Sequence, residues 1–213
     1  MAGDHGPPQR HFRAGHHRPV IGSNTFLQSS LPDYCGRPAY PRYTAIMTAA
    51  ETIRIAAQPL TAGAFARYGE VINPRRVGGQ FDNHPYDPET SGQEAQLTLT
   101  NGVPRLWIMQ LRRNGLRFNT MARHERVTQC LGALQGKDWF IAVAPAGKPV
   151  NAHDIVAFRV PGDCLIKLHV NTWHAGPHFI HDECLFFNLE NLGTNKHDFI
   201  AAQLPATVEI VDG

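Results

Sequence analysis

Two short segments of the chain carry side chains that can move protons or hold a metal ion. The first contains His124 and Gln129, and the second contains His169, Trp173 and His174. Imidazoles titrate near neutral pH and therefore suit acid–base catalysis. Imidazole nitrogen together with amide oxygen also suits a borderline divalent ion such as nickel or zinc more than calcium. We expect the other histidines of this half to be structural or exposed, namely His153, His178, His181 and His197.

The spacing within each segment predicts a turn. Side chains alternate between the two faces of a strand, so His124 and Gln129, an odd number of residues apart, would face opposite sides of an uninterrupted strand. A turn near residues 125–126 would bring them to one side. The second segment has the same odd spacing between its histidines, and it predicts a turn at Asn171 because Asn tolerates positive φ.

Many short strands surround these segments. Turn signals recur at roughly ten-residue spacing without intervening helices, which is typical of a sandwich or barrel. A helix is predicted over residues 60–69, with Thr61 as its N-cap and Gly69 as its left-handed stop, and a loop over residues 75–92. Strands 105–111 and 138–144 are apolar enough that we expect both faces to be covered, with Trp107 in the core. The other predicted strands are 70–72, 96–100, 127–134, 155–160, 163–170 and 183–189.

The composition excludes several classes of protein. The 213 residues are 42% hydrophobic and 18% charged, as expected for a globular domain with one core. A net charge of +2 without a basic block argues against a nucleic-acid partner. No apolar run approaches the roughly 20 residues of a membrane-spanning helix, so we expect no membrane partner. Four scattered cysteines without a CxxC pair argue against a disulfide framework and favour a reducing compartment, the cytoplasm.

The beginning of the chain differs from the rest. Residues 1–46 contain five arginines, no lysine, four histidines and six prolines, with no sustained periodicity. We predict that residues 1–46 are a disordered extension and that residues 47–213 form a single catalytic domain. An interaction tail or a weak metal-binding histidine cluster is the alternative for the extension, in which we place no function.

The two chemical segments resemble the two motifs of the cupin superfamily. In the first motif a His is followed by a Glu and then a Gly, and these positions are taken by His124, Gln129 and Gly136. In the second motif a Gly-Asp turn precedes a strand, a tight turn and a His, which are matched loosely by residues 162–163 and His174. The resemblance implies a mainly β fold, namely a cupin-like double-stranded β-helix (jelly-roll) barrel with a few short helices.

The cupin metal set differs here from its usual composition of three His and one Glu. Ala122 stands where the first motif has its earlier His, and Gln129 stands in place of the Glu. The chain therefore keeps at most two His and one Gln of that set.

A closer resemblance is to the bacterial and fungal ureidoglycolate lyases. Four segments match that family in its order and near its spacing, and together they span about residues 55–190. The chain departs from the family over residues 75–96, and it has Met121-Ala122 where an acidic residue usually precedes the first motif His. The matching segments are Leu60-Thr61…Phe65…Tyr68-Gly69-Glu70-Val71-Ile72, Arg123-His124…Thr128-Gln129, Lys148-Pro149…Ala157-Phe158 and His169…Trp173-His174.

The resemblance implies an activity and a set of residue roles. The family, often dimeric and associated with nickel, splits ureidoglycolate into glyoxylate and urea in allantoin and purine catabolism. We expect His174 to exchange protons, with His169 as the general base or its positioning partner. Lys148 or Arg123 would neutralise the substrate carboxylate, and Arg123 and Trp173 would bind substrate. The residues expected to hold a divalent metal, or the substrate directly, are His124, Gln129 and His174.

Two other functions remain open at this stage. One is a cupin enzyme acting on another small hydroxy or keto acid, and the other is a protein that binds a small carboxylate without turnover. The missing first-motif His weakens dioxygenase chemistry. No helix-turn-helix is visible to support a regulator, and no Ser-His-Asp order supports acyl-enzyme chemistry.

Overall fold

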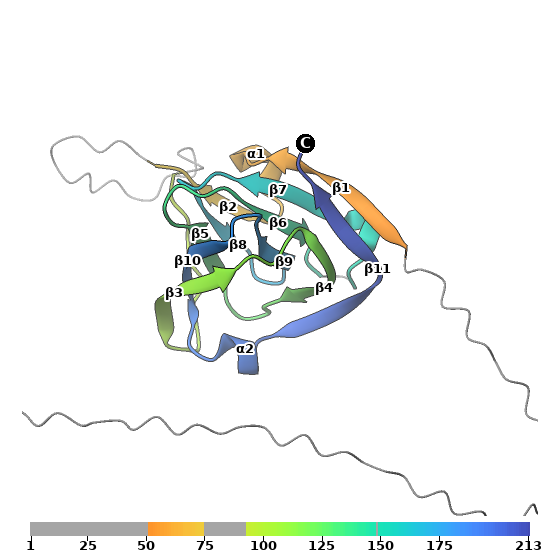
Figure 1. The fold of residues 1–213 in the computed structure, drawn as a ribbon. Helices are drawn as coiled ribbons and strands as arrows, with labels where there is room; N and C mark the ends of the chain where they lie inside the picture. The colour runs from red at the N-terminus through yellow and green to blue at the C-terminus, as the bar shows by residue number, and fades with distance from the viewer. Residues whose placement is uncertain (1–50, 75–92, 148) are drawn as a thin grey trace, which may run out of the picture. The chain divides into compact units, whose positions relative to one another are not determined.

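The computed structural model describes residues 51–74, 93–147 and 149–213, and these residues form two β-sheets (Figure 1). The expected mainly β, jelly-roll type of barrel with short helices is confirmed. One sheet closes into a barrel whose strands follow the order β1 (Thr52–Pro59), β11 (Ile200–Val211), β4 (Arg117–Arg123), β9 (Trp173–His178), β6 (Trp139–Ala144) and β7 (Val156–Val160). The second sheet has the order β2 (Gly69–Ile72), β8 (Leu165–Leu168), β5 (Gln129–Ala133), β10 (Glu183–Asn191) and β3 (Pro104–Arg112).

The hydrophobic side chains form two separate cores, because the strands of the barrel wall present apolar residues on both faces. Trp139 and Ile141 of β6 pack with Phe186 of β10, between the barrel wall and the five-stranded sheet. Their neighbours Phe140 and Ala142 pack instead into the core enclosed by the barrel. Strand β6 is buried along its whole length, as its apolar run predicts.

The predicted helix is present but shorter than expected. Helix α1 (Ala62–Phe65) begins after Thr61, whose hydroxyl accepts the backbone N–H of Ala64 at 3.2 Å, so the N-cap is confirmed. Gly69 is not the helix stop but the first residue of β2. A Cβ at this position would collide with the carbonyl oxygen of Lys167 in the paired strand β8, so the close approach of two backbones requires the glycine.

Most of the predicted strands are present, and the exceptions have physical causes. Residues 96–100 form no strand, although Thr98 exchanges backbone and side-chain hydrogen bonds with Thr128. Strand β3 is not covered on both faces, because Leu106 and Ile108 point outward and are 62% and 59% exposed. Strands β1, β4, β9 and β11 were not predicted, since each is interrupted by polar residues, glycine or proline.

Short helices complete the described part of the chain. They are the 3₁₀ helix η2 (Ala152–Asp154) and α2 (Thr194–His197), in addition to α1. None of the helices among the described residues has the length and apolar character needed to cross a bilayer. The predicted extension at residues 1–46, the predicted loop at 75–92 and Lys148 lie outside the described residues.

Candidate active site

The two chemical segments meet where β4 and β9 lie side by side. His124 follows the last residue of β4, and His174 pairs with Ala122 of that strand. Asn171 has a φ of 70°, which confirms the predicted turn, and its N–H donates to the carbonyl of His124 at 2.6 Å. This hydrogen bond joins the two segments directly.

His124 and His174 form a close pair of buried imidazoles. Their ring centroids are 5.4 Å apart. Nδ1 of His124 lies 2.5 Å from the carbonyl of Asp198, and Nδ1 of His174 lies 3.0 Å from the carbonyl of Thr172. A carbonyl oxygen can only accept, so each Nδ1 carries the hydrogen, and in the neutral form of each ring the lone pair is on Nε2. Both rings line one cavity.

This cavity lies between the five-stranded sheet and strands β4 and β9, and its volume is about 360 Å³. We call it the histidine cavity. Its wall includes His124, Gln129, His174, His178, Glu190 and Trp107. A volume of this size accommodates a small organic acid rather than a polymer.

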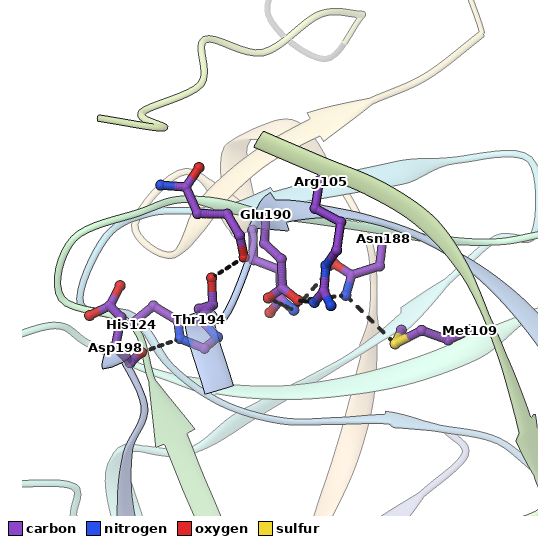
Figure 2. A network of polar contacts seen from close by, with 9 residues as sticks. Arg105, Met109, His124, Asn188, Glu190, Thr194 and Asp198 are labelled. Atoms are coloured by element: carbon purple, nitrogen blue, oxygen red, sulfur yellow. Dashed lines mark hydrogen bonds and ion pairs between the residues drawn. The ribbon is translucent and has the colours of Figure 1, made fainter. Parts of the chain in front are cut away.

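A buried carboxylate organises the sheet side of the histidine cavity (Figure 2). Glu190 on β10 is 1% exposed and forms an ion pair with Arg105 of the neighbouring β3. The same carboxylate accepts from the side-chain amide of Asn188 at 3.3 Å and from Nε2 of Gln129 at 3.2 Å. The charge is therefore compensated by one cation and two amide donors, as a buried carboxylate requires.

Glu190 also fixes the orientation of the Gln129 amide. A carboxylate accepts hydrogen bonds and, when ionised, cannot donate, so the NH₂ group of Gln129 must face Glu190 and Asn188. The amide oxygen Oε1 is consequently turned away from them and is buried without a hydrogen-bond partner among the described residues. Gln129 thus presents an acceptor and not a donor.

Burial, and secondarily the neighbouring His124, lower the pKa of His174 to about 4. The main cause is the cost of placing a positive charge in a site shielded from water, and the neighbouring imidazole adds to it. His174 is therefore neutral at pH 7, and its Nε2 is available to accept a proton or a hydrogen bond.

His169 is placed away from the histidine cavity. Its Nδ1 lies 3.1 Å from Nζ of Lys167, which is itself paired with Glu70, and its Nε2 lies 3.2 Å from the carbonyl of Ala66. Burial, and then the charge of Lys167, lower the pKa of His169. The structure therefore does not bring His169 together with His124 and His174.

Arg123 and Trp173 line a different cavity, of about 450 Å³, together with Pro149, Val150 and Gln203. The Arg123 guanidinium lies 4.8 Å above the Trp173 ring, and its Nη2 donates to Glu125 at 2.7 Å. Each is the immediate neighbour of a cavity histidine in the sequence. Adjacent residues of a strand point to opposite faces, which explains why the predicted set divides between two cavities.

Several residues of the histidine cavity were not predicted from the sequence. Trp107, expected in the core, is 38% exposed and lies on the cavity wall, and His178 lies there too although it was expected to be ordinary. The signal for the sheet side was present in β10, where Asn188 and Glu190 follow the buried Phe186 at two-residue intervals. Polar residues on the inward face of an otherwise apolar strand indicate a binding or catalytic site.

The donor atoms of the cavity fit a divalent metal only in part. Among residues 51–74, 93–147 and 149–213, no three His, Cys, Asp or Glu side chains gather closely enough to hold a metal ion. Two imidazoles whose Nδ1 atoms are held by carbonyls, together with the unpartnered Oε1 of Gln129, nevertheless offer neutral donors suited to a borderline ion.

The fold and the site define a class of protein. A jelly-roll barrel with a histidine-lined cavity opening between its sheets is the arrangement of a cupin-type enzyme acting on a small molecule. The family model described as ureidoglycolate lyase matches residues 52–210. The chain belongs to the ureidoglycolate lyase family and is an enzyme of that type. No curated protein matches the chain significantly.

Proposed function

We propose that the chain cleaves ureidoglycolate into glyoxylate and urea in the histidine cavity. The observation that carries this proposal is the buried pair His124 and His174, whose rings line one cavity in a chain of this family. The substrate carbon bears a hydroxyl, a carboxylate and a ureido nitrogen. Cleavage requires removal of the hydroxyl proton and protonation of the departing nitrogen, and imidazoles suit both steps.

His174 takes the hydroxyl proton at Nε2 in the proposed reaction. As that proton leaves, the oxygen forms the aldehyde carbonyl, and the electron pair of the carbon–nitrogen bond passes to nitrogen. The departing nitrogen then receives a proton from the imidazolium. Because the pKa of His174 is about 4, its protonated form is a strong acid that returns the proton readily, so no net proton is consumed.

The surrounding residues hold the reacting groups in place. His124 shares the proton or contacts the hydroxyl, and its ring orientation is set by the Asp198 carbonyl. Gln129 Oε1 accepts a hydrogen bond from the substrate. His169 receives no role because it lies outside the cavity, and Arg123 and Trp173 receive none in the chemical step because they face the neighbouring cavity.

We further propose that His124, His174 and Gln129 hold, as an alternative arrangement of the same site, a divalent ion, nickel by family resemblance. In that arrangement Nε2 of His174 is a metal ligand and does not take the hydroxyl proton. Such an ion would supply a positive charge for the substrate carboxylate and would acidify the hydroxyl. Nickel binding to the purified full chain, measured by calorimetry, should weaken at least about tenfold in His124→Asn. Equal affinity in that variant would contradict the ligand assignment.

The activity test incubates the full-length protein with racemic ureidoglycolate, with and without nickel or manganese. Glyoxylate is followed by coupled reduction, and urea and ammonia are measured separately. Urea without ammonia supports the lyase, whereas ammonia without urea indicates a hydrolase. His174→Asn should lower kcat by about 100-fold or more, while His153→Asn, which alters an exposed imidazole outside the cavity, should not. Equal turnover in all variants would reject the site.

We also propose that the chain is a homodimer. The outward face of the β3–β10 pair supports this, because exposed Leu106 and Ile108 lie beside Leu189 and Phe187 at the edge of the sheet. Ile108→Glu should shift the mass measured by light scattering from dimer to monomer. A wild-type monomer would contradict the proposal.

A cytoplasmic location is the last proposal, and free cysteines support it. Cys130, Cys164 and Cys184 are unpaired thiols, as expected in a reducing compartment. Cell fractionation with immunodetection would test it, and recovery in an oxidising compartment would refute it.

A further inference from the structure

His178 is a third histidine of the cavity, and the proposed chemistry leaves it without a role. It is the last residue of β9, four positions beyond His174, and its ring stacks on Phe118 with centroids 5.3 Å apart. Its Nδ1 lies 3.2 Å from the carbonyl of Gly115. Its Nε2 is buried and has no hydrogen-bond partner among the described residues.

The protonation of this ring follows from its surroundings. The Gly115 carbonyl can only accept, so Nδ1 carries the hydrogen and Nε2 keeps a lone pair. Burial lowers the pKa of His178, which keeps the ring neutral. A buried acceptor without a donor costs about 1–3 kcal/mol of folding free energy. In a cavity wall, such an acceptor can be satisfied by a hydrogen-bond donor of a bound ligand.

The wall around His178 offers acceptors to a ligand. Among the residues that the structure describes, Gln129 Oε1 is the other buried cavity acceptor without a partner, and the His174 ring adds a third lone pair. No lysine or arginine is among the described residues that line the cavity. A carboxylate facing Nε2 of His178 would place two acceptors against each other, so this atom requires an N–H or O–H of the ligand.

The position of His178 selects among the donors of ureidoglycolate. The hydroxyl and the inner nitrogen belong to the reacting carbon and must lie at His174. Two residues four positions apart on a strand are about 13 Å apart, less where a bulge shortens it, which leaves room for the rest of a small ligand between their rings. The terminal amino group is the donor farthest from the reacting carbon.

We propose that Nε2 of His178 accepts a hydrogen bond from the terminal NH₂ of the ureido group and thereby determines specificity for it. This inference rests on the proposed function, because it takes ureidoglycolate as the substrate. His178 is a binding residue and has no part in proton transfer. A site built around a buried acceptor discriminates strongly against a ligand that lacks the matching donor.

Two inert ligands test this assignment without turnover. N-carbamoylglycine and N-acetylglycine share a carboxylate and an inner N–H, and they differ in a terminal NH₂ against a methyl group. Calorimetry on the full-length wild type should show N-carbamoylglycine binding about tenfold or more tightly than N-acetylglycine. In His178→Phe, which keeps an aromatic ring against Phe118 but has no acceptor, the preference should fall below about threefold.

A second variant and a control separate loss of the acceptor from damage to the fold. His178→Gln supplies an amide oxygen and should retain part of the preference, whereas His153→Phe should retain all of it. Near-ultraviolet circular dichroism confirms that each variant is folded. A preference unchanged in both His178 variants, or absent from the wild type, overturns the inference.

The result of the ligand-preference test can be distinguished from the result of the cleavage assay for the proposed function. If the wild type cleaves ureidoglycolate but its ligand preference ignores residue 178, the inference alone fails. If the wild type shows the preference, loses it in His178→Phe and yet releases neither glyoxylate nor urea, the cavity binds ureido compounds and the proposed lyase reaction fails.

Discussion

Neutralising the buried carboxylate of Glu190 tests whether the sheet side of the cavity depends on it. Glu190→Gln keeps the shape of the side chain but removes the charge that Arg105 and the amides of Asn188 and Gln129 share. A hydrogen bond to a charged group contributes about 1.5–3 kcal/mol. Arg105 is partly exposed and can regain water, so we expect the free energy of unfolding to fall by about 2 kcal/mol.

The same substitution should also impair the cavity. The new amide can turn its own NH₂ toward Gln129, whose amide is then free to rotate and to withdraw Oε1 from the ligand. Losing an orienting partner of this kind typically reduces activity by about 10-fold to 100-fold, and we expect kcat/KM for ureidoglycolate to fall within that range. Urea unfolding and steady-state kinetics measure the two effects.

Glu183→Gln is the matched control because it alters a glutamate of the same strand. Glu183 is exposed and accepts from Gln110 at 2.8 Å, so its substitution should change the free energy of unfolding by less than about 0.5 kcal/mol and leave kinetics unchanged. If Glu190→Gln is as stable and as active as this control, the carboxylate neither stabilises the sheet nor orients Gln129, and the reasoning is refuted.

Three further perturbations have defined outcomes. His174→Asn should flatten the pH dependence of stability. In the unfolded chain the imidazole binds a proton below about pH 6.5, but in the folded chain only near pH 4, so the wild type loses up to about 3 kcal/mol of unfolding free energy as pH falls through that window. A urea midpoint that falls with pH equally in both proteins would contradict this. Asp198→Ala removes the carboxylate that accepts the two backbone N–H groups after His124, and it should lower the free energy of unfolding by about 1–2 kcal/mol. An unchanged melting temperature would contradict a stabilising role of this carboxylate. Gly69→Ala should lower the free energy of unfolding by about 2 kcal/mol or more, because its Cβ meets the backbone of β8. Gly63→Ala has open space around it and should be neutral or stabilising. Equal urea midpoints in the two variants would show that β2 and β8 can move apart to accept the methyl group.

The helix cap, the turn and the buried strand could be predicted from the sequence, because each depends on residues that are neighbours in the chain. Thr61 caps α1 because its hydroxyl needs only the N–H groups of the next residues, and Asn171 adopts positive φ because its own side chain permits it. The apolar run of β6 likewise predicts a strand buried on both faces. The family resemblance predicted the fold and the activity class for the same reason, since it depends on ordered segments of sequence.

The composition of the cavity depended on contacts between residues far apart in the chain. Gln129 and Glu190 are separated by 61 residues and His124 and Asp198 by 74, and no periodicity predicts which polar group meets which across two sheets. Sequence proximity does not determine which cavity a residue lines, because Arg123 and Trp173 adjoin cavity histidines yet face the other side of their strands.

The amino-acid order alone therefore established a jelly-roll enzyme of this family and the two segments that carry its histidines, because strand patterns, caps and turns are short-range properties. The packing of the five-stranded sheet against β4 and β9 decided the rest. It placed His178 and Glu190 in the cavity, left His169 outside it and turned Gln129 into an acceptor, because burial and hydrogen-bond pairing are properties of the folded chain as a whole.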